Sequence, residues 1–263
     1  MRRRILIAGA GRMGRWFITL LSNRHEVAVI EPLPERREFS EKVTIIDSYG
    51  EIRSFSPSLV INCAGLEITV DLFRELDPFL KGDTVLCDIA SLKRGVEEYY
   101  RESGRRFVSL HPMFGPTLAD MSSLQGYNML IVNGSDKEYA NFFRECFRPA
   151  GLAISEVDFN NHDEIMASAL SAPMLSSIVF AASLNGHESV PGGSSYRSQR
   201  ELAMRLLDGD SEIMSLLLTN ISTVGTIDKM IDSLTTIRGF VDKGDKDSIY
   251  RAITELSSSL RSG

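Results

Sequence analysis

Cysteine is scarce in this chain: three of its 263 residues are cysteines, and no two of them lie close together in the sequence. Each of Cys63, Cys87 and Cys146 stands among apolar neighbours, which predicts buried free thiols in a reducing compartment rather than disulfides. Cysteine and histidine residues also show no spacing that is typical of a metal site. We therefore expect neither a disulfide-stapled secreted domain nor a bound metal.

Long apolar runs and an excess of positive charge are missing as well. No uninterrupted apolar run approaches the ~20 residues that a membrane-crossing helix needs, and the run after the basic start is too short for a signal peptide. The formal net charge of -6 argues against general nucleic-acid binding. We expect a cytoplasmic globular protein that binds neither membranes nor nucleic acids.

The first 157 residues alternate short apolar strands with helical patterns. Such alternation predicts βαβ units, and nearly continuous apolar strands fit a parallel sheet covered on both faces. We expect an α/β Rossmann-type doubly wound parallel sheet over residues 1–157, with 127–133 and 152–157 as added edge strands. The other predicted strands are 4–9, 27–30, 59–64, 84–87 and 106–110, and the predicted helices include 12–22, 68–80 and 92–103.

Strand patterns end near residue 158, and helical spacing replaces them. Residues 158–263 are therefore predicted to form an all-helical domain for substrate binding and dimerisation. One predicted helix carries an apolar stripe that a small domain buries within itself or against a second copy, which favours a homodimer; the stripe is Ile227, Ile231, Leu234 and Ile237. The predicted helices are 161–184, 197–222, 224–242 and 245–260.

A G-x-G-x-x-G pattern follows the first predicted strand and opens the first predicted helix, the context in which it indicates a dinucleotide site. Its glycines permit a close approach of the backbone to pyrophosphate, and the helix N-terminus offers free N–H groups. Glu31 ends the next strand, where a carboxylate bonds ribose hydroxyls and favours NAD over NADP, whereas Arg36 and Arg37 would favour NADP. The cofactor-binding candidates are Gly9, Gly11, Arg12, Met13, Gly14 and Glu31.

His111 stands at the end of an apolar strand pattern and is followed by Pro112, Gly115 and Pro116. Because proline takes the chain out of regular structure, we expect His111 at the exit of a strand on a stiff turn. Ligands bind outside the carboxyl ends of parallel strands, so this imidazole is predicted to lie on the same edge as a nicotinamide. A histidine there suits removal of a proton from an alcohol as hydride leaves its carbon.

Three blocks of the sequence together resemble the prephenate dehydrogenase family: Gly9 to Gly14, Asp88-Ile89-Ala90-Ser91-Leu92-Lys93, and His111-Pro112-Met113-Phe114-Gly115-Pro116. The resemblance continues at His162-Asp163 and from Tyr196 to Arg205, and covers nearly the whole chain. It implies a Rossmann domain, a dimerising helical domain, and the NAD-dependent oxidation of prephenate with release of carbon dioxide. The implied product is 4-hydroxyphenylpyruvate, in tyrosine biosynthesis.

The resemblance also implies roles for single residues. His111 matches the family's catalytic histidine. Ser91 matches a serine near the substrate hydroxyl and the nicotinamide, which makes it both a catalytic and a cofactor-binding candidate. Arg205 matches the arginine that holds the ring carboxylate. Arg197 is a second substrate-binding candidate, roughly 12 Å away along the same helix. Arg200 fits a solvated helix face equally well.

Three further positions qualify this interpretation. Lys93 is expected to be a solvated residue in the first turn of a helix rather than a catalyst. His162 and Asp163 are expected to serve the junction between the domains. Met174 stands where many family members carry a second histidine near the substrate, which leaves prephenate and its amino analogue arogenate both open as substrates.

Two other functions compete with this one. A 3-hydroxyacid dehydrogenase relative would need a lysine in the helical domain, and Lys229, Lys243 and Lys246 lie there without a suggestive context. A non-catalytic NAD-binding sensor should have lost the reaction residues, but His111 and Ser91 are present. Some family members are fused to chorismate mutase or prephenate dehydratase, so association with either is a further expectation.

Overall fold

The computed structural model describes residues 2–93, 95–115, 123–184, 186, 191–209 and 211–262. Pro116, the last residue of the histidine motif, lies outside them. The chain divides into two compact units, Met1–Asp163 and Glu164–Gly263. The sequence placed a boundary between residues 157 and 158, whereas the units part inside helix α6 (Phe159–Met166). The reason is that the first turn of α6 packs on the sheet, where the Phe107 and Phe159 rings lie 6.1 Å apart.

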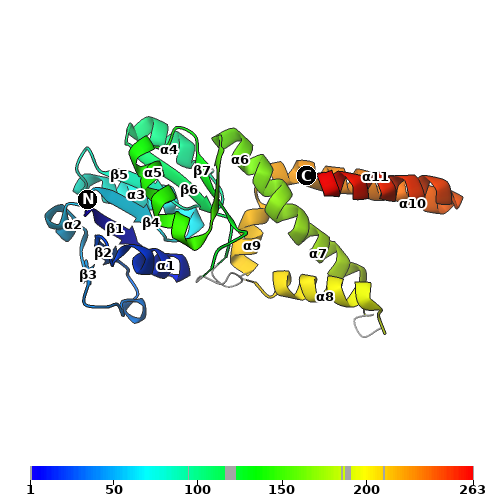
Figure 1. Cartoon of the computed structure of the whole chain (residues 1–263), viewed down its shortest axis with the longest axis horizontal. Coiled ribbons are helices and arrows are strands. Elements are labelled where there is room, and N and C mark those ends of the chain that lie inside the picture. The colour runs from blue at the N-terminus through cyan, green and yellow to red at the C-terminus, as the bar shows by residue number, and fades with distance from the viewer. Residues whose placement is uncertain are drawn as a thin grey trace. The chain divides into compact units, whose positions relative to one another are not determined.

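An eight-stranded sheet forms the first unit, in the order β3-β2-β1-β4-β5-β6-β7-β8 (Figure 1). The strands from β1 to β6 run parallel, so their carboxyl ends meet at one edge. β7 is antiparallel to β6 and parallel to β8. The strands are β1 Arg4–Ala8, β2 Glu26–Ile30, β3 Val43–Ile45, β4 Leu59–Asn62, β5 Val85–Asp88, β6 Phe107–Pro112, β7 Asn128–Val132 and β8 Ala153–Val157.

Helices cover both faces of this sheet, because successive residues of a strand point to opposite sides. Ile5 and Ile7 of β1 belong to one apolar cluster, together with Phe17 of α1 and Phe143 of α5. Leu6 belongs to the other cluster, which includes side chains of α2, α3 and α4. The helices are α1 Arg12–Leu21, α2 Tyr49–Phe55, α3 Thr69–Leu76, α4 Val96–Ser103 and α5 Lys137–Phe147.

The predicted α/β doubly wound class is confirmed, and both predicted edge strands are present as β7 and β8. The short elements β3 and α2 were not predicted. The prediction for His111 needs a correction, because His111 and Pro112 are the last residues of β6 rather than part of a turn beyond it. Pairing with the antiparallel β7 extends the strand, since His111 lies opposite Leu130 and Pro112 opposite Met129. Proline is tolerated there because the strand ends with it.

The second unit is helical throughout its described residues, as the sequence predicted. α7 (Ala172–Leu184) continues α6 through a π-helical turn, Ala167–Ser171. The single helix predicted over 197–222 is instead two, α8 (Ser194–Leu207) and α9 (Ser211–Leu218), which part at Gly209. Two further helices are α10 (Ser222–Lys243) and α11 (Lys246–Ser262), joined at Gly244.

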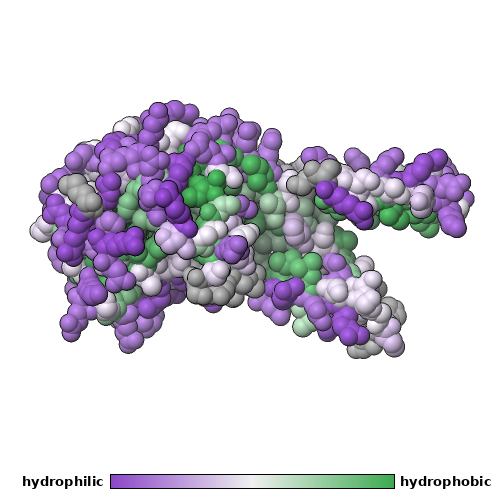
Figure 2. Space-filling model, in the orientation of Figure 1, coloured by the Kyte–Doolittle hydropathy of each residue, from purple (hydrophilic) through white to green (hydrophobic). Residues whose placement is uncertain are grey.

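Much apolar surface of the second unit is exposed, and Figure 2 shows hydrophobic residues along one side of the α10–α11 hairpin. The continuous helix Phe159–Leu184 is also long and apolar enough to cross a membrane, by length and composition only. This stretch contains no long uninterrupted apolar run, because serines separate its alanines and aliphatic residues, and the sequence did not predict it as a candidate span. Apolar helices inside or between protein subunits pass the same test, so the composition alone assigns no membrane role.

Candidate active site

The glycine-rich turn between β1 and α1 needs glycine at two positions for reasons of packing. Gly9 has a φ of +94°, and a Cβ atom there would lie 2.8 Å from the Ala64 nitrogen. A Cβ on Gly14 would lie 2.1 Å from the Gly9 carbonyl oxygen, so the helix could not approach the turn. Gly11 is different, because a Cβ there would meet no described atom within 4 Å. Packing does not require glycine at Gly11, whereas close approach of a ligand to the backbone does.

Glu31 lies at the end of the neighbouring strand and holds this turn directly. Its carboxylate accepts hydrogen bonds from the backbone N–H of Ala10 at 2.6 Å and of Leu33 at 3.0 Å. The side chain is buried, with 3% of the residue exposed. The two bonds occupy one lone pair on each oxygen, so further acceptor capacity remains for ribose hydroxyls. Arg12 is exposed and Met13 half-buried at the start of α1, where no described side chain caps the helix.

The neighbouring arginines differ in their availability. The Arg37 guanidinium donates to the Glu31 carbonyl oxygen at 2.5 Å and pairs with Asp47 at 2.7 Å. Arg37 is therefore committed to holding the β2–β3 connection. Arg36 is exposed in the short turn Pro34–Arg36.

Two more candidates lie at the carboxyl edge of the same sheet. Ser91 is half-buried just after β5, and His111 is buried in β6, with 2% of the residue exposed. β5 and β6 are parallel neighbours, so their ends are adjacent. Ser91 does not cap α4, because that helix begins later than predicted, at Val96.

A chain of three side chains fixes the protonation of the His111 ring. His111 Nδ1 lies 2.9 Å from His162 Nε2, and His162 Nδ1 lies 2.9 Å from an oxygen of Asp163. An ionised carboxylate only accepts hydrogen bonds, so the proton of a neutral His162 is on Nδ1. His162 Nε2 then accepts from His111 Nδ1–H. This pattern assigns the lone pair of His111 to Nε2, the nitrogen that a base uses.

The charge state of His111 fits the same role. Burial lowers its pKa well below the usual value, and the positive charge of Lys93 and the neighbouring His162 lower it further. The imidazole is therefore neutral at physiological pH. The sequence did not predict contact between His111 and His162, since 51 residues separate them. The only signal for it was the position of His162-Asp163 at the start of a helix.

The predicted substrate arginines belong to the second unit. Arg197, Arg200 and Arg205 are all exposed on α8, whereas Ala203 of the same helix is buried. Met174 is half-buried in α7. These arginines and Met174 are therefore described as parts of the second unit only.

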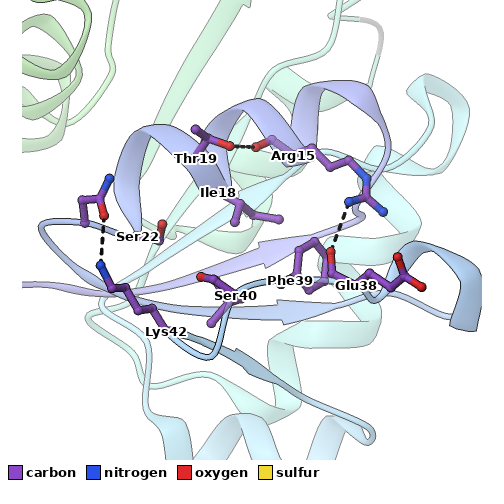
Figure 3. A pocket seen from close by; sticks show the side chains of 10 residues that line it. Arg15, Ile18, Thr19, Ser22, Glu38, Phe39, Ser40 and Lys42 are labelled. Atoms are coloured by element: carbon purple, nitrogen blue, oxygen red, sulfur yellow. Dashed lines mark hydrogen bonds between the residues drawn. The ribbon is translucent and has the colours of Figure 1, made fainter.

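A surface hollow of about 420 Å³ lies between α1 and the segment before β3 (Figure 3). Arg15 and Lys42 line it, with Phe39 and Ile18 at its apolar side. None of the predicted site residues lines this hollow, and Arg15 is bonded to the Glu38 carbonyl oxygen. It is therefore separate from the glycine-rich turn and from His111.

Comparison with known proteins agrees with this geometry. Residues 21–143 match the family profile described as prephenate dehydrogenase, nucleotide-binding domain. A search of curated proteins found no match.

Solved structures share the fold. A prephenate dehydrogenase from A. aeolicus, in complex with hydroxyphenyl propionate and NAD+, has a TM-score of 0.82 at 17% identity, covering 100% of this chain and 98% of its own. An arogenate dehydrogenase from Synechocystis has a TM-score of 0.79 at 15% identity, covering 98% and 99%. A pyrroline-5-carboxylate reductase from Coxiella burnetii has a TM-score of 0.52 at 14% identity, covering 100% and 98%.

The parallel sheet, the glycine-rich turn and the helical second unit define a Rossmann-type dinucleotide-binding protein of the dehydrogenase class. Within that class, residues 21–143 are similar to the nucleotide-binding domain of the prephenate dehydrogenase family.

Proposed function

We propose that this protein oxidises prephenate to 4-hydroxyphenylpyruvate with NAD as the hydride acceptor and His111 as the base. The observation that carries the proposal is the hydrogen-bonded series from Asp163 through His162 to His111. It supports a neutral imidazole whose Nε2 is free of a proton. That nitrogen accepts the proton of the ring alcohol as hydride leaves the same carbon. Loss of carbon dioxide then makes the ring aromatic and needs little further catalysis.

The residues of the glycine-rich turn fit NAD. The space beside Gly11 admits a pyrophosphate, and the N-terminus of α1 offers its dipole to the negative charge. Bound there, NAD supplies the hydride-accepting nicotinamide. Glu31 favours ribose hydroxyls over a 2′-phosphate, and Arg37 is held by Asp47, which leaves it poorly placed to bind that phosphate.

Arogenate is the second candidate substrate. Met174 supplies neither a charge nor a hydrogen-bond donor where the family resemblance implies a histidine. The side chain of the substrate, which is the part that differs between prephenate and arogenate, must then be held by other groups. The fold is shared with the arogenate dehydrogenase from Synechocystis as well.

We also propose that the helical unit pairs with a second copy of itself. Ile231 and Leu234 on α10 are 54% and 56% exposed, and Ile253 and Leu256 on α11 are 62% and 63% exposed. Apolar side chains repeated along two adjacent helices form a continuous surface that water solvates poorly. A second copy offers a surface of the same composition, and an isologous pair buries both.

The test is the appearance of NADH absorbance at 340 nm, with prephenate and arogenate in parallel and with NAD and NADP in parallel. Turnover of prephenate with NAD is the expected result. Turnover of arogenate alone would keep His111 as the base and reassign the substrate. Binding of NAD without turnover of either would overturn the proposal in favour of a cofactor sensor.

A further inference from the structure

A buried ion pair lies directly behind the His111 strand. Lys93 Nζ is 2.5 Å from Asp88 Oδ2, and the two residues are 3% and 0% exposed. The other oxygen of Asp88 accepts a hydrogen bond from the Tyr100 hydroxyl at 2.9 Å. The sequence predicted Lys93 to be a solvated residue in the first turn of a helix, and this prediction was wrong. α4 begins at Val96, after Gly95 in a left-handed conformation, and Lys93 turns inward instead.

The ammonium group of Lys93 also ties two strands together. It donates to the Leu110 carbonyl oxygen of β6 at 2.7 Å, while Asp88 is the last residue of β5. Leu110 immediately precedes His111 in the chain. The Asp88 carboxylate additionally accepts from the Ala90 N–H at 3.1 Å, in the segment that leads to Ser91. One buried cation therefore links the ends of both strands that carry the predicted reaction residues.

Stability alone is a poor explanation for this arrangement. Removing two charges from water costs several kcal/mol per ion, and well-packed apolar residues of similar volume often serve the fold equally well or better. The pair lies at the carboxyl edge of the sheet, next to His111. Fixing the geometry and charge of that edge explains the buried ion pair better than stability does.

We propose that Lys93, held by Asp88 and Tyr100, is a positioning residue that braces the end of β6 and places a fixed positive charge beside the His111 imidazole. The proposal deepens the proposed function and rests on it only for the consequence in turnover. Its structural and electrostatic parts concern the free protein.

The positive charge of Lys93 changes the pKa of His111 in a defined direction. Two titratable groups act on His111: His162 of α6, which is hydrogen-bonded to its ring, and Lys93, whose ammonium group bonds the carbonyl oxygen of the adjacent Leu110. Asp163 is bonded to His162, and Asp88 to Lys93. Lys93 disfavours the protonated imidazole and so lowers the pKa of His111. Removing the lysine charge must then raise that pKa, and the base will be lost to protonation at a higher pH than in the wild type.

The experiment measures the titration of His111 without using turnover. The protein is labelled at its four histidines with ¹³C, and the His111 signal is assigned by its loss in His111→Gln. Lys93→Met removes the charge but leaves Asp88 buried and unpaired, so the double variant Asp88→Asn with Lys93→Met is measured beside it. Arg105→Met is the matched control, because Arg105 pairs with Asp77 at 2.6 Å at the other end of β6.

We expect the His111 signal to titrate about one pH unit higher in Lys93→Met than in the wild type and in Arg105→Met. The upward shift should be smaller in the double variant, because that variant also loses the negative charge of Asp88. The acidic limb of kcat/KM should move upward by the same amount. An unchanged His111 titration in a folded lysine variant would overturn the proposal. A shifted titration in a protein that turns over neither prephenate nor arogenate would instead contradict the proposed function and leave the role of Lys93 intact.

Discussion

The two units of this protein differ in how they use their apolar residues. The first unit buries whole strands, and phenylalanines of α1 and α5 pack over one face of its sheet. In the second unit, four described apolar residues are buried: Met166, Ala167, Ala203 and Leu217. The first unit therefore has a core of its own, which gives the site residues a rigid frame. Many described apolar side chains of the second unit are exposed, which is the observation behind the proposed pairing with a second copy.

Polar residues divide in the same way. Buried charge and buried imidazole gather at the carboxyl edge of the first unit, around Lys93 and His111. In the second unit, the three arginines of α8 are exposed: Arg197, Arg200 and Arg205. A buried group keeps one geometry and one protonation state, whereas an exposed arginine is free to reorient onto a ligand. The comparison predicts that rate depends mostly on the first unit, and substrate affinity on the second.

Replacing the base should have the largest effect on turnover. His111→Asn is expected to lower kcat by ~10²–10⁴, the usual contribution of a general base, with the affinity for NAD nearly unchanged. Stopped-flow kinetics and NAD titration by fluorescence give the two quantities. Unaltered kcat would remove His111 from the mechanism. Equal losses in kcat and in the affinity for NAD would show that the variant damages the cofactor site instead.

A charge introduced on the exposed apolar face of α10 should weaken the proposed pairing of two copies. Leu234→Glu is expected to raise the dimer dissociation constant by about 100-fold or more, because two buried leucines would be replaced by two charges. Sedimentation equilibrium measures this constant. Thr235→Glu on the same helix is the control and should change it little. A monomeric wild-type protein would refute the proposed pairing.

The substrate arginine should affect KM rather than kcat. Arg205→Ala is expected to raise the KM for prephenate by about 10- to 100-fold, the cost of losing a charged hydrogen bond to a carboxylate. Arg200→Ala on the same exposed helix is the matched control. If both variants behave alike, the carboxylate is held elsewhere and the division of roles between the units fails.

Glu31→Ala should weaken NAD binding about tenfold and narrow the preference for NAD over NADP. Two causes add, since the variant loses the ribose acceptor and frees the Ala10 N–H of the turn. Isothermal titration with both cofactors gives the ratio of the two affinities. Glu35→Ala, in the exposed turn that follows, is the control. If the ratio of the affinities for NAD and NADP is unaltered, Arg36 rather than Glu31 discriminates between the two cofactors.

The pH dependence of stability should reveal the buried imidazole. The pKa of His111 is lowered in the folded protein, so below about pH 6.5 the unfolded chain binds a proton that the folded chain excludes. The free energy of unfolding should fall by up to about 1.4 kcal/mol per pH unit in that range. Urea titrations of wild type and His111→Asn measure the difference. If the free energy of unfolding has the same pH dependence in the wild type and in His111→Asn, then His111 is protonated in the folded state.

The sequence predicted the parts of the fold that follow from local pattern. Strand and helix alternation, the glycine-rich turn and the acidic residue after β2 are each recognised from a short stretch of sequence. It did not predict that Pro112 ends a strand, because the antiparallel partner β7 is a later segment. Nor did it predict the contact of His111 with His162 or the inward turn of Lys93. Both depend on which strand ends become neighbours, and on burial that outweighs the preference of lysine for water.

The cysteines of this chain all lie in the first unit, and none is bonded to another. Cys87 is fully buried in β5, and burial raises the pKa of its thiol well above the usual value. Cys63 and Cys146 are half-buried rather than buried as predicted, and their thiol pKa values are raised for the same reason. Alkylating reagents attack only the thiolate of an accessible cysteine. The rate at which Cys87 is alkylated therefore measures how often the sheet of the first unit opens. Fraying of the helices in the second unit does not change this rate.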